Sequence, residues 1–135
     1  TRLIDMGIEA FNVASAVNLV AAQRLVRRIC TDCKAPATYT REEVLSLGTD
    51  LENVRFMKGT GCDACGGSGY RGRQGLYEVM ALSPELRRMI LRGASVEEIR
   101  IQAVREGMLT LRADGVKKVE RGITTLEEVV KETAA

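Results

Sequence analysis

The stretch GCDACGGSGYRGRQGLYEV, from Gly61 to Val79, places two cysteines two residues apart, ahead of a segment rich in glycine and arginine. A second CxxC pair, CTDC, occupies residues 30–33, and 28 residues separate the two pairs. Each CxxC turn presents two thiolates, and two such turns complete a tetrahedral metal site. The spacing therefore predicts one four-thiolate centre with the ligands Cys30, Cys33, Cys62 and Cys65.

The remaining composition supports this prediction. The chain contains no histidine, so a tight tetrahedral site must use all four thiolates. The glycines after Cys65 suit a metal knuckle, where backbone amides approach sulfur and adopt torsions that side chains resist. Lys34, Arg71 and Arg73 lie near the cysteines in sequence and offset the negative charge of the centre. We expect a closed structural Zn²⁺ site with no open position for catalysis.

Several alternatives remain open at this stage. Two disulfides would use the same cysteines, although a chain without a secretory signal is expected to keep its thiols reduced. Iron also accepts four-sulfur geometry, as in rubredoxin-like electron-transfer domains. Residues 62–69 fit CxxCxGxG, the repeat of the cysteine-rich domain of J-domain co-chaperones. A phosphate loop is less well matched, because neither the lysine nor the following helix of such a loop is present.

Composition limits the class of protein. The 135 residues are 45% hydrophobic but only 4% aromatic, which predicts an aliphatic core. A net charge of +2, with both signs interleaved, argues against a nucleic-acid binder. No apolar run approaches the roughly 20 residues that span a bilayer, so we expect no membrane insertion. The opening residues TRLIDMGIEAF do not resemble a natural start, and we expect a fragment of a longer protein.

Apolar spacing predicts the elements in the first two thirds of the chain. Apolar residues recur every four positions from Val13 to Ile29, which predicts an amphipathic helix over 13–29. A capping box at Thr40 and Glu43 predicts a short helix ending near Gly48. Short strands are expected at residues 54–57 and 76–80, with a glycine-punctuated loop between the second CxxC pair and the second strand.

The last third carries repeated helix-capping signals. Ser83 precedes a proline and begins a helix that Gly93 ends, and the other expected caps are Ser95, Thr110 and Thr125. Capping boxes pair Ser95 with Glu98 and Thr125 with Glu128. The predicted fold class is α+β and mainly α: a small tetracysteine zinc-knuckle subdomain, then a short strand and a bundle of capped helices.

Three stretches together resemble the C-terminal portion of the type IV pilus assembly and type II secretion ATPases. They are RLIDMGIEAF with AAQRLVRRIC, then GCDACGGSGYRGRQGLYEVM, then GMLTLRADGVKKVERGITTLEEV. The resemblance implies that the four cysteines are the ligands of that family's zinc-binding subdomain. It also implies that residues 1–29 continue from a missing RecA-like lobe, that 30–70 form the zinc subdomain, and that 71–135 form a strand and helical subdomain.

The resemblance further implies a role in a larger motor. ATP and Mg²⁺ would bind only upstream, where the Walker A, Walker B, aspartate-box and histidine-box residues of the family lie, so this fragment is expected to be no enzyme. Its partners would be other subunits of a hexameric ring and an inner-membrane platform protein, at a cytoplasmic site peripheral to that membrane. Arg71 and Arg73 are candidate coupling residues because they follow the second CxxC pair and precede the expected strand. Arg87 is a further candidate, since the segment around it resembles an element of the retraction ATPases.

Overall fold

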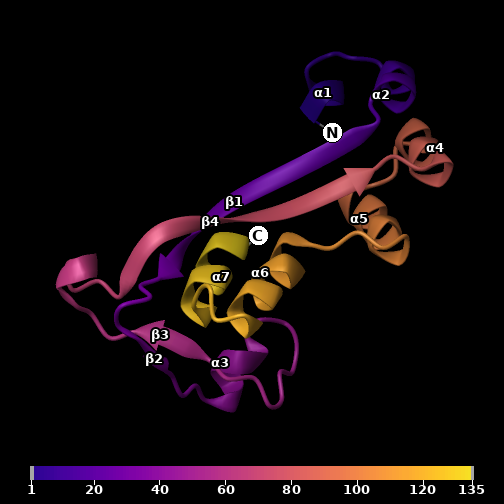
Figure 1. The fold of residues 1–135 in the computed structure, drawn as a ribbon. Helices are drawn as coiled ribbons and strands as arrows, with labels where there is room; N and C mark the ends of the chain where they lie inside the picture. The colour runs from indigo at the N-terminus through magenta and orange to yellow at the C-terminus, as the bar shows by residue number, and fades with distance from the viewer. Residues whose placement is uncertain (1, 135) are drawn as a thin grey trace. The chain divides into compact units, whose positions relative to one another are not determined.

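The computed structural model describes residues 2–134, which form two compact units. Among these described residues, one unit comprises 2–22 and 78–110, and the other comprises 23–77 and 111–134. Two long strands, β1 (Leu19–Ile29) and β4 (Tyr70–Ala81), pair with each other in a two-stranded sheet, and Figure 1 shows their arrows pointing in opposite directions. The fold class is α+β and mainly helical, as the sequence predicts. The three-part domain division stays a prediction.

The first unit is helical apart from the ends of the two long strands. Its helices are α1 (Arg2–Asp5), α2 (Ala10–Ala16), α4 (Pro84–Arg92) and α5 (Val96–Arg105). Ser83 and Ser95 cap α4 and α5 as predicted, and Ser95 completes its capping box with Glu98. The core of this unit is formed by Leu82, Leu86, Met89 and Ala103. No helix among residues 2–134 is both long and apolar enough to cross a bilayer.

The second unit carries the cysteines. Its further elements are β2 (Lys34–Pro36), α3 (Arg41–Leu45), β3 (Met57–Gly59), the 3₁₀ turn η1 (Asp63–Cys65), α6 (Leu111–Glu120) and α7 (Leu126–Thr133). Strands β2 and β3 are antiparallel, with Lys34 opposite Gly59. The core consists of Val44, Leu47, Val116, Val119, Leu126 and Val129.

Helices α6 and α7 lie side by side (Figure 1) and pack closely. A Cβ atom on Gly115 of α6 would lie 2.6 Å from a methyl carbon of Val129, so only glycine permits this approach. Asp114, the neighbour of Gly115, is buried and accepts a hydrogen bond from the backbone N–H of Tyr77 at 3.0 Å. Lys118 forms an ion pair with the same carboxylate at 3.2 Å. The helix pair is thereby attached to β4.

The predicted helix over residues 13–29 is wrong. Helix α2 ends at Ala16, and residues 19–29 form strand β1. Leu25 belongs to the apolar series on which the helix was predicted, yet it is 47% exposed, whereas Val26, outside that series, is buried. Pairing with β4 decides the conformation here, because strand pairing and burial outweigh the weak intrinsic preference of a segment for helix.

Two strand boundaries also differ from the predictions. The strand expected at residues 54–57 is β3 at 57–59, because its partner β2 fixes the register. The strand expected at 76–80 extends back to Tyr70, so Gly72 and Gly75 lie within β4 rather than in a loop. Gly72 has a φ of +83°, which a glycine accommodates within the strand.

Candidate metal centre

The four cysteines predicted to be ligands converge on one point. The sulfur atoms of Cys30, Cys33, Cys62 and Cys65 all lie within 4.8 Å of one another. The Sγ–Sγ distances are 3.8 Å for Cys30–Cys62, 3.8 Å for Cys33–Cys65 and 3.7 Å for Cys62–Cys65. A tetrahedron with metal–sulfur bonds of about 2.3 Å has edges of about 3.8 Å. The cluster therefore has the size and donor set that a four-thiolate metal ion requires.

The first knuckle, residues 30–33, links β1 to β2. Cys30 directly follows β1, is fully buried, and donates its backbone N–H to the carbonyl of Gly69 at 2.9 Å. The carbonyl of Cys33 accepts hydrogen bonds from the backbone N–H of Thr60 at 3.1 Å and from its hydroxyl at 3.2 Å. The first knuckle is therefore held by the segments on either side of the second.

The second knuckle, residues 62–65, consists of Cys62 and the turn η1 that follows it. It ends at Gly66, whose φ of +66° is left-handed. The Cys65 sulfur accepts N–H donors from Cys62 at 3.2 Å and from Gly69 at 3.2 Å. A third N–H, from Gly61, reaches the Cys33 sulfur at 3.3 Å. Such donors stabilise thiolates, which are the form that binds metal.

The two sulfurs of the second knuckle differ in acidity. Burial raises the pKa of the Cys65 thiol, but the N–H groups of Cys62 and Gly69 outweigh this effect and lower the pKa to about 6. For Cys62, the backbone N–H of Cys65 lowers the pKa, while burial and the neighbouring thiols together raise it to about 11. The N–H donors of this turn therefore favour a thiolate at Cys65.

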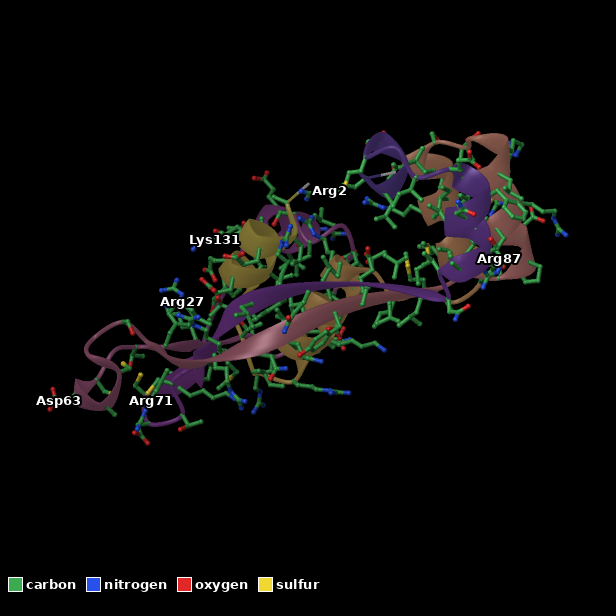
Figure 2. All side chains as sticks on the ribbon, turned by 90° about the horizontal axis from the view of Figure 1, so that it is seen from above. Arg2, Arg27, Asp63, Arg71, Arg87 and Lys131 are labelled. Atoms are coloured by element: carbon green, nitrogen blue, oxygen red, sulfur yellow. The ribbon has the colours of Figure 1, made fainter. Side chains whose placement is uncertain are left out.

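The candidate coupling arginines of β4 differ in their contacts. Arg71 lies 3.7 Å from Asp32, and both side chains are exposed, so this ion pair contributes little stability. Figure 2 shows sulfur atoms gathered between the labelled Asp63 and Arg71. Arg73 is exposed and has no ion pair within the described part of the chain. The structure thus brings Arg71 beside the cysteines and leaves the Arg73 guanidinium available.

Arg87 lies in the other unit. Its guanidinium donates to the carbonyls of Ala14 and Val17 and to the side chain of Asn18, with the Val17 bond at 3.0 Å. These acceptors lie at the C-terminal end of α2, where free carbonyls attract a cation. Arg87 therefore already has a local partner, and its role in coupling stays a prediction.

The sequence did not predict the ion pair between Arg27, three residues before Cys30, and Glu128. The Glu128 carboxylate, on a residue only 2% exposed, accepts the Arg27 backbone N–H at 2.9 Å, Nε at 3.0 Å and Nη2 at 2.7 Å. Figure 2 shows Arg27 beside α7. The guanidinium carbon of Arg27 lies 4.0 Å from the ring centre of Tyr70. Glu128 does not complete the predicted capping box with Thr125, because Arg27 occupies its carboxylate, although Thr125 still caps α7.

This cluster fixes the end of β1 just before Cys30. The hydroxyl of Thr124 donates to the Arg27 carbonyl at 2.8 Å, and the Ile29 N–H donates to the Ile123 carbonyl at 2.9 Å. The Tyr70 hydroxyl lies 2.8 Å from that of Thr125. Residues 123–128 therefore bind three backbone groups of β1, the N–H and the carbonyl of Arg27 and the N–H of Ile29, and so position the ligand Cys30 that follows.

The model of the family described as "Type II/IV secretion system protein" matches residues 1–131. The chain belongs to this family. This membership argues against the two other classes of domain considered above, the rubredoxin-like domain and the cysteine-rich domain of co-chaperones.

Named relatives of the family match nearly the whole chain. A type IV pilus assembly ATPase, PilB, from Thermus thermophilus is 45% identical, over 98% of this chain and 15% of the relative. PilB from Pseudomonas aeruginosa is 43% identical, over 98% of this chain and 24% of the relative. The type II secretion system protein E from Aeromonas hydrophila is 40% identical, over 98% of this chain and 26% of the relative. The chain thus spans about a quarter or less of these relatives.

Proposed function

We propose that this family member binds one Zn²⁺ through Cys30, Cys33, Cys62 and Cys65, and that the ion stabilises a coupling domain of a hexameric secretion or pilus-assembly ATPase. The observation that carries the proposal is the convergence of the four sulfurs within 4.8 Å of one another, with three of the distances at 3.7 to 3.8 Å as in a four-thiolate zinc site. Four protein thiolates fill the coordination shell of zinc and leave no position for substrate or water. The site is therefore structural, and iron is the competing metal for the same donors.

The parent protein is proposed to be the ATPase. Relatives of both secretion and pilus systems bear that name, and this chain matches about a quarter of their length. ATP and Mg²⁺ would bind in the remaining part of the parent, and the fragment itself would not hydrolyse ATP. The ring of subunits would work at the cytoplasmic face of the inner membrane, where this domain passes nucleotide-driven motion to a platform protein.

The contacts of the centre explain how zinc would serve such a role. The cysteines lie where β1 ends, where β2 begins and just before β4, so one ion would join three strands. Residues 46–56, which lie between the two knuckles, contain no helix or strand, so an ion that joins the knuckles would close this loop-rich part of the chain. A rigid knuckle transmits force, whereas a flexible one would absorb it.

Arg73 provides a test of coupling. In this proposal its planar guanidinium binds a carboxylate on the adjoining lobe or on a neighbouring subunit. Arg73→Ala in the full-length protein is expected to lower pilus assembly or secretion severalfold, while zinc content and thermal melting stay unchanged. Arg73→Lys should restore little, because lysine keeps the charge but loses the two-pronged hydrogen bonding.

The matched control is Arg55→Ala, at another exposed arginine of the same unit. If Arg73→Ala removes zinc, the arginine serves the fold of the metal site and the coupling role fails. If Arg73→Ala retains full activity, the side chain is simply solvated.

A further inference from the structure

The two arms of the loop that carries the second knuckle, residues 59–61 and 67–69, cross in direct main-chain contact. A Cβ atom on Gly69 would lie 2.5 Å from the carbonyl oxygen of Gly59, and a Cβ atom on Gly59 would overlap the carbonyl of Gly69. A second crossing follows at once, where a Cβ atom on Gly61 would lie 2.8 Å from the carbonyl oxygen of Gly67. A side chain on Gly59, Gly61 or Gly69 would therefore separate the two arms at these points.

Each side of the crossing is bonded to the metal ligands. On one side, Thr60 and Gly61 donate their N–H groups to the carbonyl and the sulfur of Cys33, at 3.1 Å and 3.3 Å. On the other side, Gly69 donates its N–H to the Cys65 sulfur at 3.2 Å and accepts the Cys30 N–H at 2.9 Å. The distance between the crossing chains therefore sets the distance between the two knuckles.

We propose that Gly59 and Gly69 are positioning residues for the metal centre, and that their main-chain contact sets the size of the four-sulfur cage. This inference rests on the proposed zinc site. Gly59 lies at the end of β3, opposite Lys34 of β2 and outside both CxxC motifs. Moving Gly59 away from Gly69 would shift Cys33 relative to Cys65, so the four sulfurs would no longer match a single ion.

Two variants separate crowding from backbone strain. Gly59 is not among the glycines with positive φ, so Gly59→Ala introduces crowding against Gly69 without torsional strain. Gly67 has a φ of +83°, and a Cβ atom on it would meet nothing within 4 Å, so Gly67→Ala introduces strain without crowding. Gly69→Ala combines both effects, with a φ of +81°. The proposal predicts that crowding, and not strain, weakens metal binding.

The experiment measures zinc affinity of the whole 135-residue chain by competition with a chromophoric chelator. Gly59→Ala and Gly69→Ala are expected to weaken zinc binding by about 10- to 100-fold, as losses around metal ligands do. Gly67→Ala is expected to bind zinc almost as the wild-type chain does. After Co²⁺ substitution, the visible absorption bands of the Gly59→Ala protein should shift, and those of the Gly67→Ala protein should not.

Wild-type affinity in Gly59→Ala, or equal losses in Gly59→Ala and Gly67→Ala, would overturn the inference while leaving zinc binding intact. A wild-type chain that binds no zinc would instead overturn the proposed function, and the inference with it. If Gly59→Ala does not fold, Gly61→Ala replaces it, because a Cβ atom on Gly61 would lie 2.8 Å from the carbonyl oxygen of Gly67 and crowd the second crossing. Severalfold weaker zinc binding is then expected, and unchanged binding would contradict the inference.

Discussion

Replacing Cys62 with serine is expected to empty the metal centre. The change removes one of four thiolates, and the remaining three cannot complete a closed tetrahedral shell. Metal binding at structural zinc sites contributes about 10–16 kcal/mol in small peptides, so its loss should loosen residues 30–65. Helices α4 and α5 should persist, because their caps and core lie in the other unit. Elemental analysis measures the zinc, and circular dichroism measures the remaining helix.

The control for Cys62→Ser is Asp63→Ser. Asp63 is the next residue, is exposed, and belongs to the same turn without offering a thiolate. Asp63→Ser should retain a full complement of zinc and melt as the wild-type chain does. If Cys62→Ser retained as much zinc as Asp63→Ser, the four-ligand assignment would be wrong.

Replacing Glu128 with glutamine is the second large effect that we expect. The buried carboxylate accepts three hydrogen bonds from Arg27. A hydrogen bond to a charged group contributes about 1.5–3 kcal/mol to the free energy of unfolding. The Arg27 side chain is 51% exposed, so water replaces part of what it loses. Together these considerations predict a loss of about 2–3 kcal/mol, which lowers the melting temperature on the order of 10 °C.

Glu127→Gln is the matched control for this substitution. Glu127 is the neighbouring residue on α7, is exposed, and accepts one hydrogen bond from the Tyr39 hydroxyl at 2.9 Å. Its replacement should change the melting temperature only slightly. Equal melting temperatures for the Glu127 and Glu128 variants would show that the Arg27–Glu128 pair does not stabilise the second unit.

The stabilisation by Glu128 should depend on pH. Burial raises the pKa of this carboxyl, but the hydrogen bonds and charge of Arg27 outweigh burial and lower the pKa below its ordinary value. A carboxyl whose pKa is lowered in the folded state stabilises that state fully above its unfolded pKa of about 4.3. The stabilisation disappears as the pH falls through the lower folded value. The difference in stability between the wild-type and Glu128→Gln chains should therefore be constant near neutral pH and shrink in acid.

The features that sequence predicts correctly here are local. A serine or threonine at the start of a helix acts within one turn, so the caps at Ser83, Ser95 and Thr125 are readable from a few residues. The cysteine cluster is equally readable, because CxxC fixes each pair of thiolates within its own turn.

The features that sequence does not predict depend on distant partners. Residues 19–29 become a strand because they pair with β4, some fifty residues later, while their own spacing favours a helix. Glu128 has the sequence context of a capping residue, and only the fold brings Arg27 to it. Gly59 likewise has no motif of its own, since its importance comes from Gly69, on the other arm of the loop that carries the second knuckle.

The metal content of the purified chain, prepared without added metal, tests the central claim most directly. The account predicts one zinc ion per chain in a colourless protein, removable only by strong chelators or by protonation of the thiolates. Bound iron with a visible charge-transfer band would contradict the assignment of zinc. A chain that contains no metal, and whose second unit nevertheless melts cooperatively and unchanged in the presence of chelator, would contradict the structural role of the centre.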